Sequence, residues 1–150
     1  AYKVGVINLL GRVWLEGHND PFETAEKIIN ELKKETEIIL VDFHAEATAE
    51  KKALGYFLDG KVSCVFGTHT HIQTSDAGIM SGGTGYITDL GMTGPKDSVL
   101  GVKKEIIINR LKSNDMSKFE LADGECILNG CIFDVDNSTG KTTRVERICI

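Results

Sequence analysis

The sequence predicts an α/β fold: a sandwich of mixed β-sheets flanked by helices, ending in an antiparallel meander. Two observations support this prediction. In the N-terminal half, short runs of buried-strand character alternate with stretches of helical periodicity, an order typical of parallel strands joined by helical crossovers. Towards the C-terminus, strand-like runs follow one another directly, separated by hairpin-type turns at Asp123-Gly124 and Asp136–Gly140.

The elements of the N-terminal half are predicted from periodicity and capping signals. Asp20 suits the N-cap of a helix, Pro21 its first position and Glu23 the capping-box position. The predicted order is a strand over Lys3–Leu10, a helix from Pro21 with Phe22, Ala25, Ile29 and Leu32 on its inner face, a strand over Glu37–Val41, a helix over Ala49–Leu58 with Ala53, Leu54, Phe57 and Leu58 inward, and a strand over Val62–Phe66.

The C-terminal half is richer in glycine and in turn residues. Ser81–Gly85 predicts a turn and Asp89–Asp97 a loop, while the run Ile106–Ile108 leaves a strand open as an alternative to a helix. The predicted order is a short strand over Tyr86–Thr88, a helix over Val102–Leu111, and strands over Lys118–Ala122, Cys126–Val135 and Thr142–Ile150.

Length and composition predict one soluble domain over residues 1–150, with 41% hydrophobic and 26% charged residues. The net charge of −5 argues against a nucleic-acid duplex as partner, because phosphate binding favours a basic face. No apolar run approaches a membrane span, and we expect no signal peptide. The four cysteines lack C-x-x-C spacing, so we expect buried free thiols and a cytoplasmic location rather than two disulfides.

Histidines follow two of the predicted buried strands. His44 comes shortly after one strand, and Gly67 ends the next just before His69 and His71. Because ligands gather beyond the carboxyl ends of parallel strands, and because side chains two apart point the same way in an extended chain, we expect these three histidines to address one metal site. His18 lies in a polar segment and is expected to be a surface-loop residue.

Carboxylates near the histidines offer supporting roles. Asp42 and Glu46 are candidates for metal ligands or for orienting an imidazole from outside the metal, with solvated or helix-capping groups as the simpler interpretation. Thr93 and Gly94, in the glycine-rich loop, are candidates for a substrate-side loop, with a plain turn as the alternative. Histidines with nearby carboxylates suit zinc, manganese or iron, so the residues predict a metal-dependent hydrolase-like site.

Three segments resemble the YmdB family of bacterial metallophosphoesterases: Val41–Thr48, Val65–Thr74 and Tyr86–Pro95. The resemblance covers essentially the whole chain. It implies a metallophosphoesterase-type sandwich, and phosphodiester hydrolysis of cyclic nucleotides, including 2′,3′-cyclic mononucleotides, with two divalent metal ions (iron, manganese or zinc). By position, His44 and His69 resemble ligands of one ion and His71 a ligand of the other.

The chain also departs from the family pattern. Family members are longer; they begin with a metal-binding aspartate and carry a bridging glutamate and a Gly-Asn-His motif, none of which is found here. The chain thus resembles the C-terminal portion, and we expect it to have little phosphodiesterase activity alone. Because Lys3–Leu10 is apolar on both faces, we expect either self-association or association with the missing N-terminal portion, besides a small-molecule phosphodiester substrate.

Two other functions fit parts of the sequence. An amidohydrolase-like metal hydrolase also uses two histidines separated by one residue after a strand, although a barrel of that class needs a longer chain. A non-catalytic fragment that acts as a binding or assembly module is the third interpretation.

Overall fold

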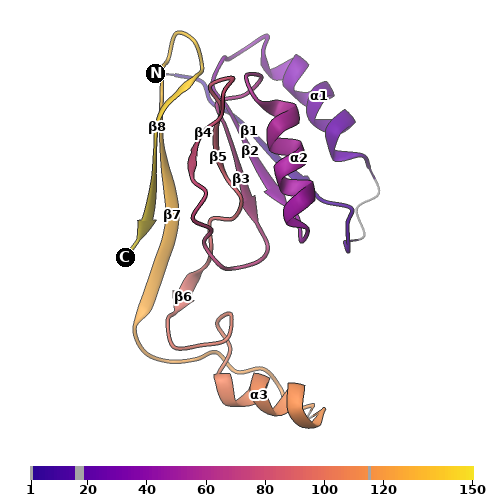
Figure 1. The fold of residues 1–150 in the computed structure, drawn as a ribbon, viewed down its shortest axis with the longest axis vertical. Coiled ribbons are helices and arrows are strands. Elements are labelled where there is room, and N and C mark those ends of the chain that lie inside the picture. Colours follow the sequence, from indigo (N-terminus) through magenta and orange to yellow (C-terminus); the bar gives the residue numbers. More distant parts are fainter. Residues whose placement is uncertain (1, 16–18, 115) are drawn as a thin grey trace.

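A computed structural model describes residues 2–15, 19–114 and 116–150. The prediction for His18 lies outside these residues. The predicted α/β sandwich is confirmed, with helices α1 and α2 on one side of a mixed sheet and the β7–β8 hairpin on the other (Figure 1).

The larger sheet has five strands in the order β1-β2-β3-β5-β4. Strands β1, β2 and β3 pair in parallel, as the strand–helix alternation predicts. Strand β5 also pairs in parallel with β3, and β4 pairs antiparallel with β5. Their bounds are β1 Gly5–Leu10, β2 Ile39–His44, β3 Cys64–Thr68, β4 Gly78–Ile79 and β5 Gly85–Ile87.

Helices α1 (Pro21–Leu32) and α2 (Thr48–Leu58) cover one face of this sheet. The predicted N-cap of α1 is confirmed, because Asp20 Oδ1 accepts hydrogen bonds from the backbone of Phe22 (2.8 Å) and Glu23 (3.2 Å). The core between helices and sheet contains fully buried aliphatic and aromatic side chains from both layers, among them Ala25, Ile39, Val41, Phe43, Leu54 and Leu58.

The smaller sheet has the order β6-β7-β8, with β6 at Thr93–Pro95, β7 at Cys126–Val135 and β8 at Thr142–Cys149. The hairpin contacts the larger sheet through the Phe133 ring, whose centroid lies 6.4 Å from that of Phe66. It also contacts that sheet through Thr142 Oγ1, which donates to Ser63 O at 2.6 Å. These contacts join the two sheets into one sandwich.

The C-terminal meander differs from the prediction in its third strand. Lys118–Ala122 does not form a strand but contributes one isolated bridge, between Leu121 and Val102. Its expected place beside β7 is taken by β6, from the segment predicted to be a loop. In the chain, α3 (Lys104–Ser113) lies between β6 and Lys118–Ala122, so the helix rather than the strand alternative is correct for this region. This helix stands away from the larger sheet (Figure 1).

Strand β1 is an edge strand of the sheet, paired only with β2 within the described residues. Ile7 and Leu9 are buried, but Val6 on the other face is 68% exposed and Leu10 is 46% exposed. An apolar edge strand of this kind can pair with another strand, or another segment can cover its exposed side chains.

The prediction for the cysteines holds only in part. All four cysteines are free thiols, but only Cys64 is buried, so the expectation of burial is wrong for the exposed Cys126 and Cys149. None of the helices formed by the described residues is long and apolar enough to cross a membrane.

Candidate functional site

The candidate site lies where β2 and β3 end at the same edge of the larger sheet. Both strands run further than predicted, so that His44 is the last residue of β2 and pairs in register with Thr68, the last residue of β3. Gly67 therefore lies inside β3 and does not end it. It sits close to the backbone of the neighbouring segment, because a Cβ at this position would overlap Thr88 O.

His44 and His69 face each other across this edge. The distance between His44 Nε2 and His69 Nδ1 is 3.0 Å, and the two rings are nearly perpendicular, with centroids 4.7 Å apart. On the far side of its ring, His69 Nε2 lies 2.9 Å from Glu46 Oε2. The structure thus brings two of the three predicted histidines together, with one of the two predicted carboxylates, Glu46, in direct contact with an imidazole.

Asp42 reaches His44 through a hydroxyl group. Thr68 Oγ1 donates to Asp42 Oδ1 at 2.9 Å, and His44 Nδ1 lies 3.1 Å from the same hydroxyl. Since the single hydroxyl proton goes to Asp42, His44 Nδ1 has to be the donor to Thr68. Asn8 Nδ2 donates to the other oxygen of Asp42 at 2.8 Å, which holds the carboxylate in place.

These partners leave two nitrogen lone pairs facing each other. His44 carries its proton on Nδ1, and Glu46 as a carboxylate can only accept, so a neutral His69 carries its proton on Nε2. The unprotonated atoms are then His44 Nε2 and His69 Nδ1, at 3.0 Å. Two unprotonated nitrogens at this distance repel, and either a proton shared between them or a metal ion that both nitrogens contact removes the repulsion.

The separation of the two nitrogens also suits a metal ion. Two imidazole nitrogens, each about 2.1 Å from one ion, lie about 3 Å apart when the angle at the ion is near 90°. The protonated nitrogens of both rings already have oxygen partners, as is usual for metal-binding histidines. The residues present therefore fit two positions of a coordination sphere. Within the part of the chain that the structure describes, no group of three or more His, Cys, Asp or Glu is arranged to hold one ion.

The segment after β3 is not extended, which corrects the prediction that His69 and His71 point the same way. Both residues have left-handed backbone conformations, with φ of 104° at His69 and 67° at His71. Such conformations are strained for residues other than glycine, and each costs about 1–3 kcal/mol. The surrounding structure must therefore fix this turn.

Asp89 fixes the turn through Thr70, the residue between the two histidines. Asp89 Oδ2 accepts from Thr70 N at 3.0 Å and from Thr70 Oγ1 at 2.7 Å, while Oδ1 accepts from Gly91 N at 2.9 Å. Lys51 Nζ completes the set at 2.7 Å from Oδ2, in an ion pair whose side chains are 2% and 1% exposed. Burial alone would raise the pKa of Asp89, but the hydrogen bonds from Lys51, Thr70 and Gly91 outweigh it and hold that pKa below its usual value.

Sequence reasoning missed Lys51, Thr70 and Asp89. A signal for Lys51 was present, because Lys51, Leu54, Gly55 and Leu58 follow the i, i+3, i+4, i+7 spacing of a helix face and all four are buried. The predicted inner face used Ala53 instead, which is exposed. A lysine on a buried stripe predicts a buried carboxylate partner, but nothing in the sequence indicates which one.

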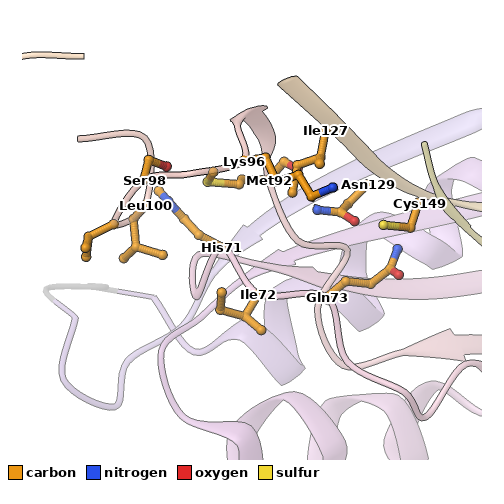
Figure 2. Close-up of a pocket in the computed structure, with 11 residues that line it drawn as sticks. His71, Ile72, Gln73, Met92, Lys96, Ser98, Leu100, Ile127, Asn129 and Cys149 are labelled. Atoms are coloured by element: carbon orange, nitrogen blue, oxygen red, sulfur yellow. The ribbon is translucent and has the colours of Figure 1, made fainter. Parts of the chain in front are cut away.

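His71 lies in the wall of a cavity at the junction of the two sheets, together with Gln73, Met92 and Asn129 (Figure 2). The candidate substrate-side residues Thr93 and Gly94 lie in strand β6 rather than in a loop, paired with Leu128 and Ile127 of β7. Their neighbours Met92 and Lys96 line the same cavity.

Comparison with known proteins agrees with this fold. The chain is 50% identical over 148 residues to the 2′,3′-cyclic-nucleotide 2′-phosphodiesterase of Bacillus subtilis (strain 168), in a match that covers 99% of this chain and 56% of the relative. Among solved structures, a hypothetical protein from Thermus thermophilus matches with a TM-score of 0.89 and 32% identity, over 97% of this chain and 56% of that one. A phosphatase of Mycoplasma pneumoniae matches with a TM-score of 0.87 and 38% identity, over 97% and 53%.

The chain spans about half the length of the curated relatives it matches. The family model described as YmdB-like protein matches residues 1–148. The chain therefore belongs to the family of YmdB-like proteins.

Proposed function

We propose that this chain provides part of the metal centre of a phosphodiesterase that hydrolyses cyclic nucleotides, with 2′,3′-cyclic mononucleotides as substrates. The observation that carries the proposal is the 3.0 Å approach of His44 Nε2 to His69 Nδ1, with the outer nitrogen of each ring on an oxygen partner, because it places both inner nitrogens where one cation can contact them. The name of the Bacillus relative supports the choice of substrate.

In this proposal His44 and His69 are ligands of one divalent ion. Glu46 and the Asp42–Thr68 pair accept the protons of the outer ring nitrogens, which fixes the ligating nitrogen of each ring and makes it more basic. A bound zinc, manganese or iron ion supplies Lewis-acid stabilisation of the negative charge that develops on a phosphodiester. His71, beyond the turn held by Asp89, is the proposed ligand of a second ion.

The remaining ligands are proposed to come from a segment outside these 150 residues. Two facts support this part of the proposal. The relatives are nearly twice as long as the matched region. The edge strand β1 also carries Val6 and Leu10 exposed on one face, where a further layer would cover them. Self-association through the same edge is the alternative. The four free thiols support a cytoplasmic location.

The test is hydrolysis of 2′,3′-cyclic AMP with manganese, by this chain alone and after mixing with the portion of the Bacillus relative that it does not match. We expect turnover only in the mixture, and its loss in a mixture made with His69→Ala. Hydrolysis of a p-nitroanilide amide by the same mixture would instead indicate an amidohydrolase-like enzyme. Turnover by the chain alone would show that residues within it complete the site.

A further inference from the structure

The cavity beside His71 is large enough for part of a substrate. Its volume is about 490 Å³, within the usual range of about 300–1,000 Å³ for small-molecule sites. It is bounded by the segment after β3, by β6 with the loop that follows it, and by the hairpin strands β7 and β8 (Figure 2). His71, which lines the cavity, follows His69 of the candidate metal site by two residues in the chain.

Most of the cavity wall is apolar. Ile72 comes from the segment after β3, Met92 from the residue before β6, Leu100 from the loop beyond β6, and Ile127 from β7. A flat, weakly polar group such as a nucleobase gains free energy by leaving water for a wall of this kind.

The polar groups of the cavity suit the rest of a nucleotide. Lys96 has a carboxylate partner, Glu125, but at 3.9 Å and with both side chains mostly exposed, so its positive charge remains available to a phosphate. Asn129 Nδ2 donates to Met92 O at 2.9 Å, which orients the amide and leaves its carbonyl oxygen as an acceptor for a hydroxyl or amino group.

We propose that this cavity is the nucleoside subsite of the phosphodiesterase, with the base against Ile72, Met92 and Ile127 and the phosphate towards His71 and Lys96. This inference rests on the proposed function, because it supposes that the phosphate lies at the neighbouring metal centre. It assigns substrate selection to the segment from β6 to α3 and to the hairpin, while the proposed metal ligands lie at the end of β2 and just beyond the end of β3.

The test measures binding of adenosine 3′-monophosphate, adenosine and inorganic phosphate to the full chain by calorimetry, with EDTA present so that metal binding plays no part. Adenosine 3′-monophosphate should bind, adenosine alone should bind more weakly, and inorganic phosphate should bind weakest. Ile127→Ala should weaken adenosine binding at least tenfold, because carbon groups in an apolar pocket have effects of about 10-fold or more. Leu128→Ala is the matched control, since it removes the neighbouring side chain, which points to the other face of β7 and is 46% exposed.

Ile72→Ala provides a second variant with little risk to folding, because this side chain lines the cavity and is 65% exposed. It should also weaken adenosine binding. Lys96→Gln should weaken adenosine 3′-monophosphate binding about threefold and leave adenosine binding unchanged, whereas Lys34→Gln, two residues beyond α1, should change neither.

The inference is overturned if adenosine does not bind, or if Ile127→Ala and Ile72→Ala bind it as well as Leu128→Ala does. Failure of the subsite and failure of the proposed function are distinguishable. Loss of nucleoside binding with intact metal binding at His44 and His69 would refute only the subsite, and the reverse result would refute only the metal centre.

Discussion

The buried ion pair between Lys51 and Asp89 offers the sharpest test of how the histidine turn is held. The two side chains are 2% and 1% exposed, and the Lys51 Nζ–Asp89 Oδ2 distance is 2.7 Å. Replacing Lys51 with methionine keeps much of the side-chain volume but leaves the Asp89 carboxylate buried without its cation. Breaking a buried pair from one side typically destabilises a protein by about 3–5 kcal/mol.

We expect a loss at the lower end of that range, about 3 kcal/mol, because Thr70 and Gly91 still donate to Asp89. Lys52→Met is the matched control on the same helix. Lys52 pairs with Asp76 at 3.4 Å with side chains 43% and 34% exposed, and an ion pair that is this accessible contributes about 0–1 kcal/mol.

Urea unfolding of the two variants and the unmodified chain gives the free energies of unfolding. Adding Asp89→Asn to Lys51→Met should recover part of the loss, because the buried charge is then removed. A difference of less than about 1 kcal/mol between Lys51→Met and Lys52→Met would refute the claim that this pair holds the turn.

Three other predictions follow from burial and close packing. Gly67→Ala should destabilise the chain by about 3 kcal/mol or more because its Cβ would overlap Thr88 O, whereas Gly78→Ala in β4, which would meet nothing within 4 Å, should cost less than about 1 kcal/mol in urea unfolding. The pKa of Asp89 is held below its usual value, so the stability that this carboxylate contributes is present above about pH 4 and is lost as the pH falls further. Asp89→Asn should therefore flatten the acid side of a curve of unfolding free energy against pH. Burial raises the pKa of Cys64 to about 12, so this thiol should resist a maleimide in the folded chain at pH 7 while the exposed Cys126 reacts, and equal labelling would contradict the described packing.

The strand–helix alternation and the capping signals predicted the larger sheet well, because both arise from local sequence. The N-cap at Asp20 and the parallel order of β1, β2 and β3 are examples. From that order alone, His44 and His69 were expected at one edge, and they are in contact there. The end of a parallel strand is a good predictor of where a side chain lies, because the register between neighbouring strands fixes which strand ends meet.

Other features depended on contacts that local sequence does not contain. Gly67 was predicted to end a strand, but it pairs with Phe43 inside one, and glycine is needed there because only a hydrogen fits beside Thr88 O. The segment Lys118–Ala122 has strand-like alternation, yet β6 occupies the place beside β7, so tertiary pairing overrode propensity. His71 follows a strained turn that Asp89 holds in place. The prediction assumed an extended chain, which contains no such turn.

Metal titration of histidine variants tests the central claim most directly. The claim is that His44 and His69 bind the same ion, so each single alanine variant should weaken zinc or manganese binding at least tenfold in calorimetry. The double variant should be little worse than either single one, because ligands of one ion act as a unit. His71→Ala should retain this binding, and thermal unfolding should confirm that every variant is folded. Unchanged affinity in both His44→Ala and His69→Ala, or two small effects that simply add, would contradict the account.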